Sequence, residues 1–371
     1  MKARSFDYIL VIIVLALVLF GLVMVFSASY YTSQKSGGTG QFFFQKQLIG
    51  AGLGFAAMIL FSLIDYHIYE KKFVMYLMVA VSTFFLILVF FTKEDINGAK
   101  RWIDLGFISF QPSEVARFSL LVLASGVFTE NFKLIRAPKL RLFIRGSWQV
   151  IAVLVLYCGL IFFEPNLSMT LSILLMVICL FFAAGVSFRV LTYAGLGAAA
   201  VGAAGILAEP WRVQRLMIFS NPWKDPTDTG YQLIQSLYAL GSGGLTGVGL
   251  GNSKQKYLYL TYGESDFILS IIGEELGFIG IMVLLFIFII LIWRGLMIAI
   301  KAKDMFGMML ASGIVSIIGI QTIIHIAVVT SSMPPTGVPL PFVSYGSTSL
   351  VVFMSSIGIL LNISRSNVKI V

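Results

Sequence analysis

The chain consists mainly of apolar stretches, each about as long as a membrane-crossing helix, separated by short polar segments. A helix needs about 20 apolar residues to cross the roughly 30 Å hydrocarbon layer of a bilayer, since each residue rises about 1.5 Å. The candidate stretches cover 8–28, 46–64, 73–92, 113–129, 148–163, 167–185, 190–208, 266–293, 306–329 and 349–363. We therefore predict an all-α polytopic membrane protein with about ten transmembrane helices, forming a single integral membrane domain over residues 1–371.

The charge distribution predicts how these helices are oriented. Only 12% of the residues are charged, and the net charge is +9. The short connection 130–147 carries five basic residues and one acidic residue, and such connections remain in the cytoplasm. This orientation places both termini in the cytoplasm and a large extracytoplasmic loop, about 209–265, between helices 7 and 8. Because the basic residues are spread among apolar spans, they indicate topology within membrane lipids and not nucleic-acid binding.

No cofactor is required by the sequence. The two cysteines, Cys158 and Cys179, both fall in apolar runs, which argues against a disulfide and against a metal site. There is no Walker loop, dinucleotide fingerprint or metal-ligand spacing, so neither ATP coupling nor a divalent cation has support. The sequence leaves open whether a divalent cation assists.

The predicted outer loop is unusually basic and leaves two interpretations open. Arginine and lysine neutralise phosphate oxygens, and a glycine-rich run at 241–251 would let backbone amides approach an anion. The first interpretation is therefore an anion site, and the second is a solvated loop with incidental charge. The basic residues concerned are Arg212, Arg215, Lys224, Lys254 and Lys256.

Asp266 begins the eighth predicted span. On a helix, Ser270, Gly273 and Gly277 would share its face, whereas Glu275 would point away. Ionisable groups in a span are costly and usually functional. The structural alternatives are a helix N-cap for Asp266 and internal ion pairing for Glu274 and Glu275, and ion pairing is the favoured prediction for Glu275.

Other polar groups lie near the same predicted outer side. Glu114 and Arg117 are three residues apart, so we expect them to pair, either structurally or while lining a cavity near Lys100 and Arg101. Prolines 334, 335, 339 and 341 precede the last span, and with the serine-rich segment from Ser344 they predict an ordered outer loop or re-entrant wall. His325, by contrast, is expected to be a packing residue whose hydrogen bonds are satisfied.

Several motifs resemble those of the SEDS family (shape, elongation, division and sporulation proteins), and they are similar to its FtsW/SpoVE branch more than to RodA. These motifs are Asn97-Gly-Ala-Lys-Arg-Trp-Ile103, Phe110-Gln-Pro-Ser-Glu114, Glu164-Pro165, Asn221-Pro222, Gly230-Tyr-Gln-Leu-Ile-Gln-Ser236, Gly241 to Tyr259, Asp266-Phe-Ile, Gly273-Glu-Glu-Leu-Gly-Phe-Ile-Gly280 and Pro339-Leu-Pro-Phe-Val-Ser-Tyr-Gly346. They run in the family's order across nearly the whole chain.

The resemblance implies ten spans and a peptidoglycan glycosyltransferase that polymerises lipid II at the outer face of the bacterial cytoplasmic (inner) membrane. It implies a class B penicillin-binding protein as the transpeptidase partner, in division, elongation or sporulation. Asp266 matches the family's essential aspartate, which we expect to act as general base. The expected substrate-binding residues are Glu114, Arg117, Lys100, Arg101, Arg212, Arg215, Lys254, Lys256 and Ser344.

The chain departs from the family pattern at four places. Asn166 replaces the aspartate of Glu-Pro-Asp, and Thr261-Tyr262 replaces Pro-Glu before the aspartate motif. These two changes question accessory carboxylates, whereas Asp266 is retained. In addition, Arg117 stands where the family usually has lysine, and His325 where it has asparagine.

Two other functions remain open from the sequence. Broken helices and polar groups at bilayer depth also suit a transporter (flippase) of lipid-linked precursors. Against this function, the charged groups cluster on the outer side, without a matching cytoplasmic constellation. A non-catalytic membrane scaffold for a penicillin-binding protein is the second alternative, and it would not need an acidic residue at position 266.

Overall fold

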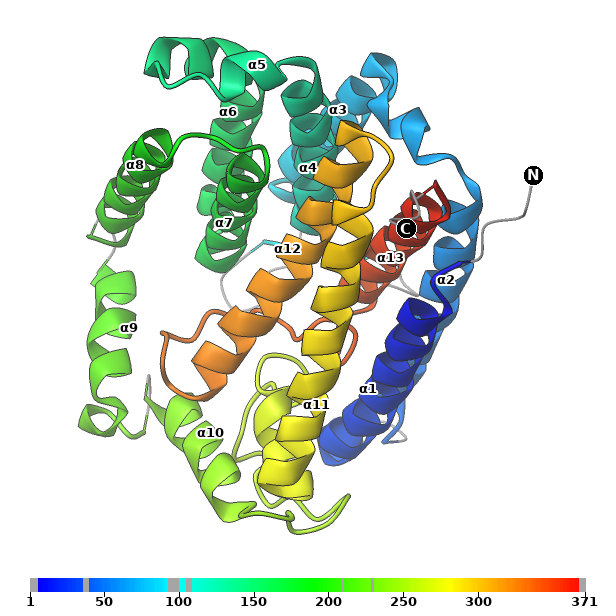
Figure 1. Ribbon diagram of the computed structural model, residues 1–371. Helices are drawn as coiled ribbons and strands as arrows, with labels where there is room; N and C mark the ends of the chain where they lie inside the picture. The colour runs from blue at the N-terminus through cyan, green and yellow to red at the C-terminus, as the bar shows by residue number, and fades with distance from the viewer. Residues whose placement is uncertain are drawn as a thin grey trace.

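The computed structural model describes residues 6–35, 40–92, 100–104, 109–207, 210–227 and 230–366 of the chain. These residues form a helical bundle in which most long helices run between the same two ends (Figure 1). The long helices are α1 (Tyr8–Lys35), α2 (Phe42–Leu63), α3 (Lys72–Val89), α4 (Pro112–Glu130), α6 (Leu140–Phe163), α7 (Leu167–Ala183), α8 (Phe188–Leu207), α11 (Ile268–Ile300), α12 (Met305–Val329) and α13 (Ser347–Ser366).

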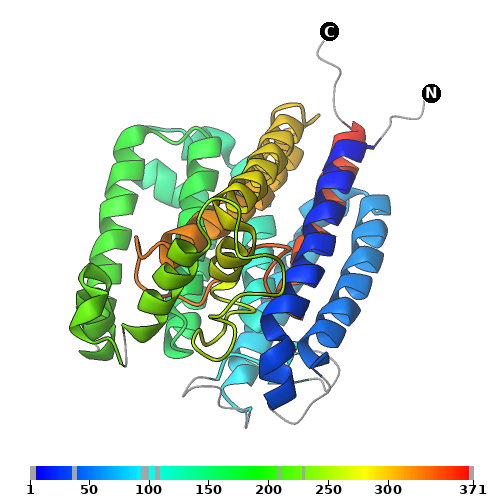
Figure 2. The same cartoon turned by 90° about the horizontal axis from the view of Figure 1, so that it is seen from below.

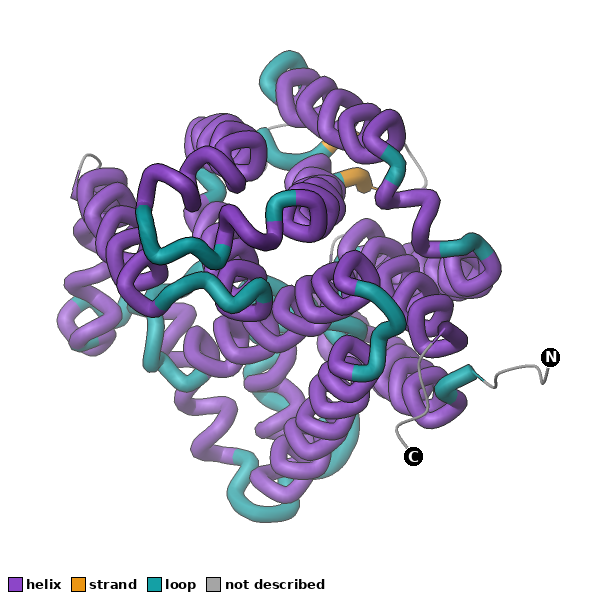
Figure 3. Tube along the Cα trace, turned by 45° about the horizontal axis from the view of Figure 1, so that its top comes forward, coloured by secondary structure: helices purple, strands orange, loops and turns teal. Residues whose placement is uncertain are grey.

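Short elements connect these helices. They are the 3-10 helices η1 (Tyr66–Glu70) and η2 (Pro222–Lys224), the helices α5 (Phe132–Ile135), α9 (Pro210–Ser220) and α10 (Tyr231–Ser242), and the strands β1 (Ile103–Asp104) and β2 (Ser109–Phe110). The two strands pair antiparallel, with Ile103 opposite Phe110, beside the surrounding helices (Figure 3).

The helices confirm the predicted all-α polytopic class. Seven of those described are long and apolar enough to cross a membrane, namely α1, α2, α3, α6, α11, α12 and α13. The other three predicted spans correspond in sequence to α4, α7 and α8. Of these, α7 is apolar but has only 17 residues, and α4 is buried along almost its whole length among other helices. A helix enclosed by protein can carry polar residues because it does not face lipid.

Both described ends of the chain lie at one end of the bundle. Arg294, near the end of α11, donates to Asp7 at 2.7 Å, and the guanidinium of Arg365 lies 3.3 Å from the centroid of the Phe6 ring. Figure 2 shows the two ends side by side, and the basic connection through α5 lies at this same end (Figure 1). An even number of crossings produces this arrangement.

The closest helix packing joins α2 to α13. A side-chain carbon on Gly358 of α13 would lie 2.4 Å from the carbonyl oxygen of Met58 on α2, so the two backbones approach directly. Such close approach requires glycine, and small residues are the usual device for packing helices inside membranes. These two helices therefore form a tightly packed side of the bundle.

The segment predicted as a loop, 209–265, contains regular structure. It contains α9, η2 and α10, and then runs without a helix from residue 243 to residue 267. The loop prediction is therefore correct only for its last part. The prolines and glycines that flank α9 and α10 are typical of loops, so the sequence did not predict these two helices.

The predicted polar stripe on the eighth span is wrong in its geometry, because α11 starts at Ile268 and its backbone breaks at Gly277. Gly277 has φ 69° and ψ −170°, which no residue in a helix adopts. The segment 244–249 restores the lost backbone hydrogen bonds: Val248 N donates to Glu274 O at 3.0 Å, and Phe278 N donates to Gly244 O at 2.9 Å. Asp266 therefore lies before the helix and Gly277 lies at its break, so the two residues do not share one continuous helical face.

The segment 330–346 forms the ordered wall that the prolines predict. Gln47 of α2 donates to Ser344 O at 3.1 Å and accepts from Gly346 N at 3.1 Å, which fixes the wall to the bundle. Tyr345 N donates to Glu264 O at 2.9 Å, so the wall also contacts the stretch before α11. Irregular backbone of this kind is tolerated where protein surrounds it.

Candidate active site

Asp266 lies in the turn before α11 and is partly buried. Its backbone N–H donates to Tyr262 O at 3.1 Å, while Phe267 occupies the N-cap position without a side-chain hydrogen bond. The N-cap explanation for Asp266 is therefore wrong. Burial raises the pKa of its carboxyl to about 6, against the opposing effects of Ser265 and of Arg101. A carboxylate with a pKa close to neutrality is suited to accept a proton.

Gly337 of the wall faces Asp266 at close range. Its φ is +67°, and a side-chain carbon built on it would lie 3.2 Å from Oδ2 of Asp266. Glycine is suited to this position because it adopts positive φ without strain and leaves room for the carboxylate.

Three side chains hold the backbone on both sides of Gly337. Ser168, in the first turn of α7, donates to Thr336 O. His325 and Gln321, both on α12, bond to carbonyl oxygens after Gly337. Nδ1 of His325 lies 2.8 Å from Val338 O, and Nε2 of Gln321 lies 3.0 Å from Pro339 O. We call residues 336–339 the strap. These three bonds fix the strap, and hence the surface that Asp266 meets.

His325 fits its predicted packing role only in part. A carbonyl oxygen can only accept, so Nδ1 carries the hydrogen in the bond to Val338. Nε2 is buried and has no hydrogen-bond partner among the described residues. His325 is therefore a positioning residue of the strap as much as a packing residue.

Arg101 connects the turn between α6 and α7 with Asp266. Its Nε donates to Glu164 O at 3.1 Å, and its Nη2 donates to Pro165 O. Its positive charge lowers the pKa of the carboxyls of both Asp266 and Glu164. Lys100 instead donates to Phe90 O at 3.3 Å, near the end of α3. Of this basic pair, Arg101 is the residue whose charge acts on the carboxyl of Asp266.

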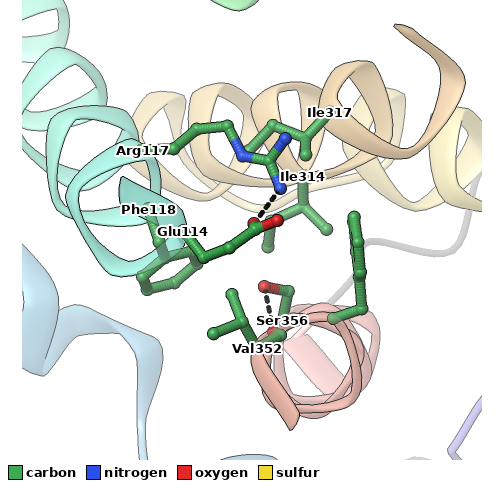
Figure 4. Close-up of a pocket in the computed structure, with 8 residues that line it drawn as sticks. Glu114, Arg117, Phe118, Ile314, Ile317, Val352 and Ser356 are labelled. Carbon is green, nitrogen blue, oxygen red and sulfur yellow. Dashed lines mark hydrogen bonds and ion pairs between the residues drawn. The ribbon is translucent and has the colours of Figure 1, made fainter. Parts of the chain in front are cut away.

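Glu114 and Arg117 form the predicted ion pair, buried on α4 (Figure 4). Arg117 also donates to Gln321 Oε1 at 2.7 Å and to Ser172 at 3.1 Å. Gln321 thus accepts from Arg117 with its oxygen and donates to the strap with its nitrogen. The pair supports the strap through Gln321.

The pair also lines a small cavity, although Lys100 and Arg101, which the second interpretation places near it, are not among its lining residues. The cavity has a volume of ≈ 10 Å³, about the space of one water. It is bounded by Glu114, Arg117, Phe118, Ile314, Ile317, Val352, Phe353 and Ser356 (Figure 4). Its size excludes a sugar, so the pair does not line a substrate pocket in this state.

The predicted basic cluster of the outer loop is divided. Lys256 turns inward: its Nζ lies 3.1 Å from Glu275 Oε1 and donates to Gly251 O at 2.6 Å. This contact confirms the ion pairing predicted for Glu275. Lys254, in contrast, has an exposed side chain, and its backbone N–H donates to Glu274 Oε1 at 2.9 Å. Arg212 and Arg215 lie on α9, and their side chains are outside the described part of the structure.

Ser344 is buried in the wall and next to the site. Its hydroxyl donates to Ser265 O at 2.6 Å and accepts from Leu340 N at 2.8 Å. Because both bonds are made within the protein, Ser344 positions the residue that precedes Asp266. In the described residues, no group of three or more histidine, cysteine or acidic side chains gathers as a metal site would require.

Sequence reasoning did not select three residues that the structure brings to this site: Glu164, Gly337 and Gln321. Glu164 had appeared only as part of a motif, at the end of an apolar span before a proline. The signal for Gly337 was its place in a proline-interrupted segment, and the signal for Gln321 was a lone amide in an apolar helix.

The fold and this site define a class: a polytopic helical membrane protein with a partly buried carboxylate and an arginine held between the helix connections at one end of the bundle. The chain belongs to the FtsW/RodA/SpoVE family of cell cycle proteins, whose model matches residues 8–369. It is 38% identical over 370 residues to stage V sporulation protein E of Bacillus subtilis, covering 98% of each chain. It is 37% identical over 366 residues to a probable peptidoglycan glycosyltransferase FtsW of a Geobacter species, again covering 98% of each.

Solved structures show the same fold. One is a chain from a study of how a peptidoglycan synthase complex coordinates polymerization and crosslinking, with a TM-score of 0.79, 24% identity, and coverage of 98% of this chain and 99% of that chain. Another is the rod shape determining protein RodA of Thermus thermophilus, with a TM-score of 0.70, 24% identity, and coverage of 98% of each chain. Family and fold confirm the resemblance derived from the motifs.

Proposed function

We propose that this protein is a peptidoglycan glycosyltransferase that polymerises lipid II into glycan strands at the outer face of the bacterial cytoplasmic membrane. The observation that carries the proposal is Asp266, a partly buried carboxylate beside Arg101 and the strap, with a pKa raised to about 6. Relatives named as peptidoglycan glycosyltransferases cover the whole chain and support the same activity.

The chemistry requires a base and a positive charge. A hydroxyl of the acceptor sugar attacks the anomeric carbon of the donor, and Asp266 accepts the proton of that hydroxyl. The bond between the anomeric carbon and the polyprenyl pyrophosphate breaks, and the pyrophosphate leaves with the electron pair. Arg101 lies where its charge can stabilise the negative charge that develops there. Because the pKa of Asp266 is about 6, the carboxylate is mostly ionised at pH 7, yet more basic than an ordinary aspartate.

The proposed membrane arrangement has ten spans with both termini in the cytoplasm, so that Asp266 faces outward, where lipid II is used. The proposed partner is a class B penicillin-binding protein that supplies the transpeptidase. Similarity to a chain of a peptidoglycan synthase complex supports such a partner. The outward Lys254 remains a proposed contact for phosphate, whereas the charge of Lys256 is used by Glu275.

Replacing Asp266 tests the proposal. Asp266→Asn preserves size and removes the proton acceptor, so polymerisation of purified lipid II by the protein with its partner should fall about 10²–10⁴-fold. The control is Asp65→Asn, the same change at the opposite end of the bundle, which should leave the rate unchanged. Near-normal polymer from well-folded Asp266→Asn would reject the catalytic role. Movement of the precursor without polymer in either protein would indicate a transporter, and unchanged output in the partner complex would indicate a scaffold.

A further inference from the structure

Glu164 is a buried carboxyl group that the folded chain leaves without a partner. It lies in the turn between α6 and α7 and is 1% exposed, and neither Oε1 nor Oε2 has a hydrogen-bond partner among the described residues. Buried polar atoms are almost always paired, and an unpaired one destabilises the folded chain. An unpaired carboxyl beside a candidate active site therefore needs a functional explanation.

The positive charge that acts on this carboxyl is Arg101. Two of its donors go to the main-chain oxygens of Glu164 and Pro165. Its charge lowers the pKa of the carboxyls of both Glu164 and Asp266, so one guanidinium acts on the two groups. Lys100 is directed to the end of α3. Burial raises the pKa of Glu164 to about 8, against the lowering effect of Arg101, so the carboxyl is mainly protonated at pH 7.

A second orphaned polar group lies at the same turn. Ser168, four residues after Glu164, donates to the main-chain oxygen of Thr336, while Oγ1 of Thr336 is buried and has no partner among the described residues. Thr336 precedes Gly337, which contacts Asp266. Two buried groups without a partner among the described residues therefore belong to this turn and to the strap that contacts it.

We propose that Glu164, in its neutral form, donates a hydrogen bond to a phosphate oxygen of the polyprenyl pyrophosphate leaving group, which Arg101 binds beside it. This inference rests on the proposed function and adds a second group at the same site. Its basis is the burial of Glu164, the absence of a hydrogen-bond partner for both oxygens among the described residues, and the hydrogen bonds by which Arg101 is held at the same turn.

The role follows from the chemistry of the step. As the bond from the anomeric carbon to the phosphate oxygen breaks, its electron pair moves onto the pyrophosphate. A protonated carboxylic acid in a water-poor site stabilises such charge by donation, and burial is the means by which proteins keep an acid neutral for this purpose. The proton stays on Glu164, and the proton of the attacking hydroxyl goes to Asp266. The neutral acid also avoids repelling the pyrophosphate, as a carboxylate would.

The pH dependence of polymerisation tests the proposal. For the protein with its partner, kcat/KM should fall as the pH rises through about 8, because Glu164 then loses the proton it donates. Glu164→Gln keeps an N–H donor that does not ionise, so its rate at pH 7 should remain within about threefold of the original, without this alkaline fall. Glu164→Ala should lose about 10²-fold in rate, the usual effect of deleting one such donor. An unchanged alkaline fall in Glu164→Gln would overturn the proposal.

Binding of the leaving group gives a readout that does not depend on polymerisation. Undecaprenyl pyrophosphate should raise the unfolding temperature of the detergent-solubilised protein, and Glu164→Ala should reduce this rise, unlike Lys139→Ala in the connection after α5. If Glu164→Ala reduces binding but the original protein makes no polymer, the pyrophosphate site stands and the proposed function fails. If polymer forms and depends on Asp266, but Glu164→Ala changes neither rate nor binding, the role of Glu164 is wrong.

Discussion

At the scale of single residues, the site joins two carboxyl groups that differ in protonation because their surroundings differ. Burial raises the pKa of Asp266 only to about 6, because the hydrogen bond from Ser265 and the charge of Arg101 both oppose it. Burial raises the pKa of Glu164 to about 8, because only the charge of Arg101 opposes it. Between these two values one group is ionised and the other is neutral. This is the combination that a base and a hydrogen-bond donor need at one site.

The acid side of the pH profile should report Asp266. A base works only when deprotonated, so kcat/KM for lipid II polymerisation should fall as the pH drops through about 6. With an ordinary aspartate as the base, the rate would stay constant until the pH fell to about 4. The measurement is a rate profile from pH 5 to 9, with folding at each pH checked by unfolding temperature. A rate that stays flat from pH 7 down to pH 5 would contradict the assignment of the base.

Adding a single methyl group at Gly337 should reduce the rate of polymerisation. In Gly337→Ala the new carbon would lie 3.2 Å from Oδ2 of Asp266, in a backbone conformation that disfavours side chains. Moving a catalytic group by about 1 Å can cost on the order of 10²-fold in rate. We expect a loss of about 10–10²-fold in polymerisation, with membrane insertion preserved.

Gly251→Ala is the matched control for this change. Gly251 also has a positive φ, +81°, but nothing lies within 4 Å of where its side-chain carbon would be. It therefore imposes the same backbone strain without crowding Asp266. Equal losses of activity in the two variants would show that strain alone, and not the contact with Asp266, explains the effect.

At the scale of elements, a buried polar anchor fixes the non-helical part of the outer segment to α11 and α1. Ser27 of α1 donates to Glu275 at 2.8 Å, and Lys256 lies 3.1 Å from the same carboxylate. Next to it, Glu274 accepts from the backbone of Lys254 and from the hydroxyl of Ser253. The hydrogen bonds between 244–249 and the break in α11 complete the attachment. The stretch that leads to Asp266 is therefore held from two sides.

Removing one member of this anchor should destabilise the protein. Lys256→Ala leaves the Glu275 carboxylate buried without its cation, a change that typically costs about 3–5 kcal/mol. The unfolding temperature in detergent should fall clearly. Lys254→Ala, two residues away on an exposed side chain, should shift stability by no more than about 0.5 kcal/mol. Similar unfolding temperatures for both variants would mean that Lys256 is not structurally engaged.

Element-scale features show where sequence reasoning succeeded and where it could not. The spans followed from length and hydropathy, and the Glu114–Arg117 pair followed from helical spacing, because both are local properties. The break at Gly277 did not follow, because glycine in an apolar helix equally indicates close packing. The inward direction of Lys256 and the contact of Gly337 with Asp266 join residues far apart in the chain. Such contacts depend on how the elements pack, and no local pattern contains that information.

At the scale of the whole molecule, topology is the testable property. A reporter fused at the C-terminal end of the chain should be cytoplasmic, and one inserted after Thr227, in the connection between η2 and α10, should be external. The reason is that the basic connection through α5 and both described ends share one end of the bundle, opposite α10 (Figure 1). Fusions to an enzyme active only outside the cytoplasm would measure this. Finding both positions on the same side would reject the ten-span arrangement.

The contact between Phe6 and Arg365 brings the two described ends of the chain together. Because the two described ends meet at one end of the bundle (Figure 2), a short tether can link them without crossing the bilayer. The chain could then be circularly permuted, with new ends opened in the connection between α11 and α12, at the same end of the bundle. Every span would keep its direction of insertion, although a different helix would be synthesised first. Correct insertion of such a permutant would show that the helix bundle that holds Asp266 forms whichever helix is synthesised first.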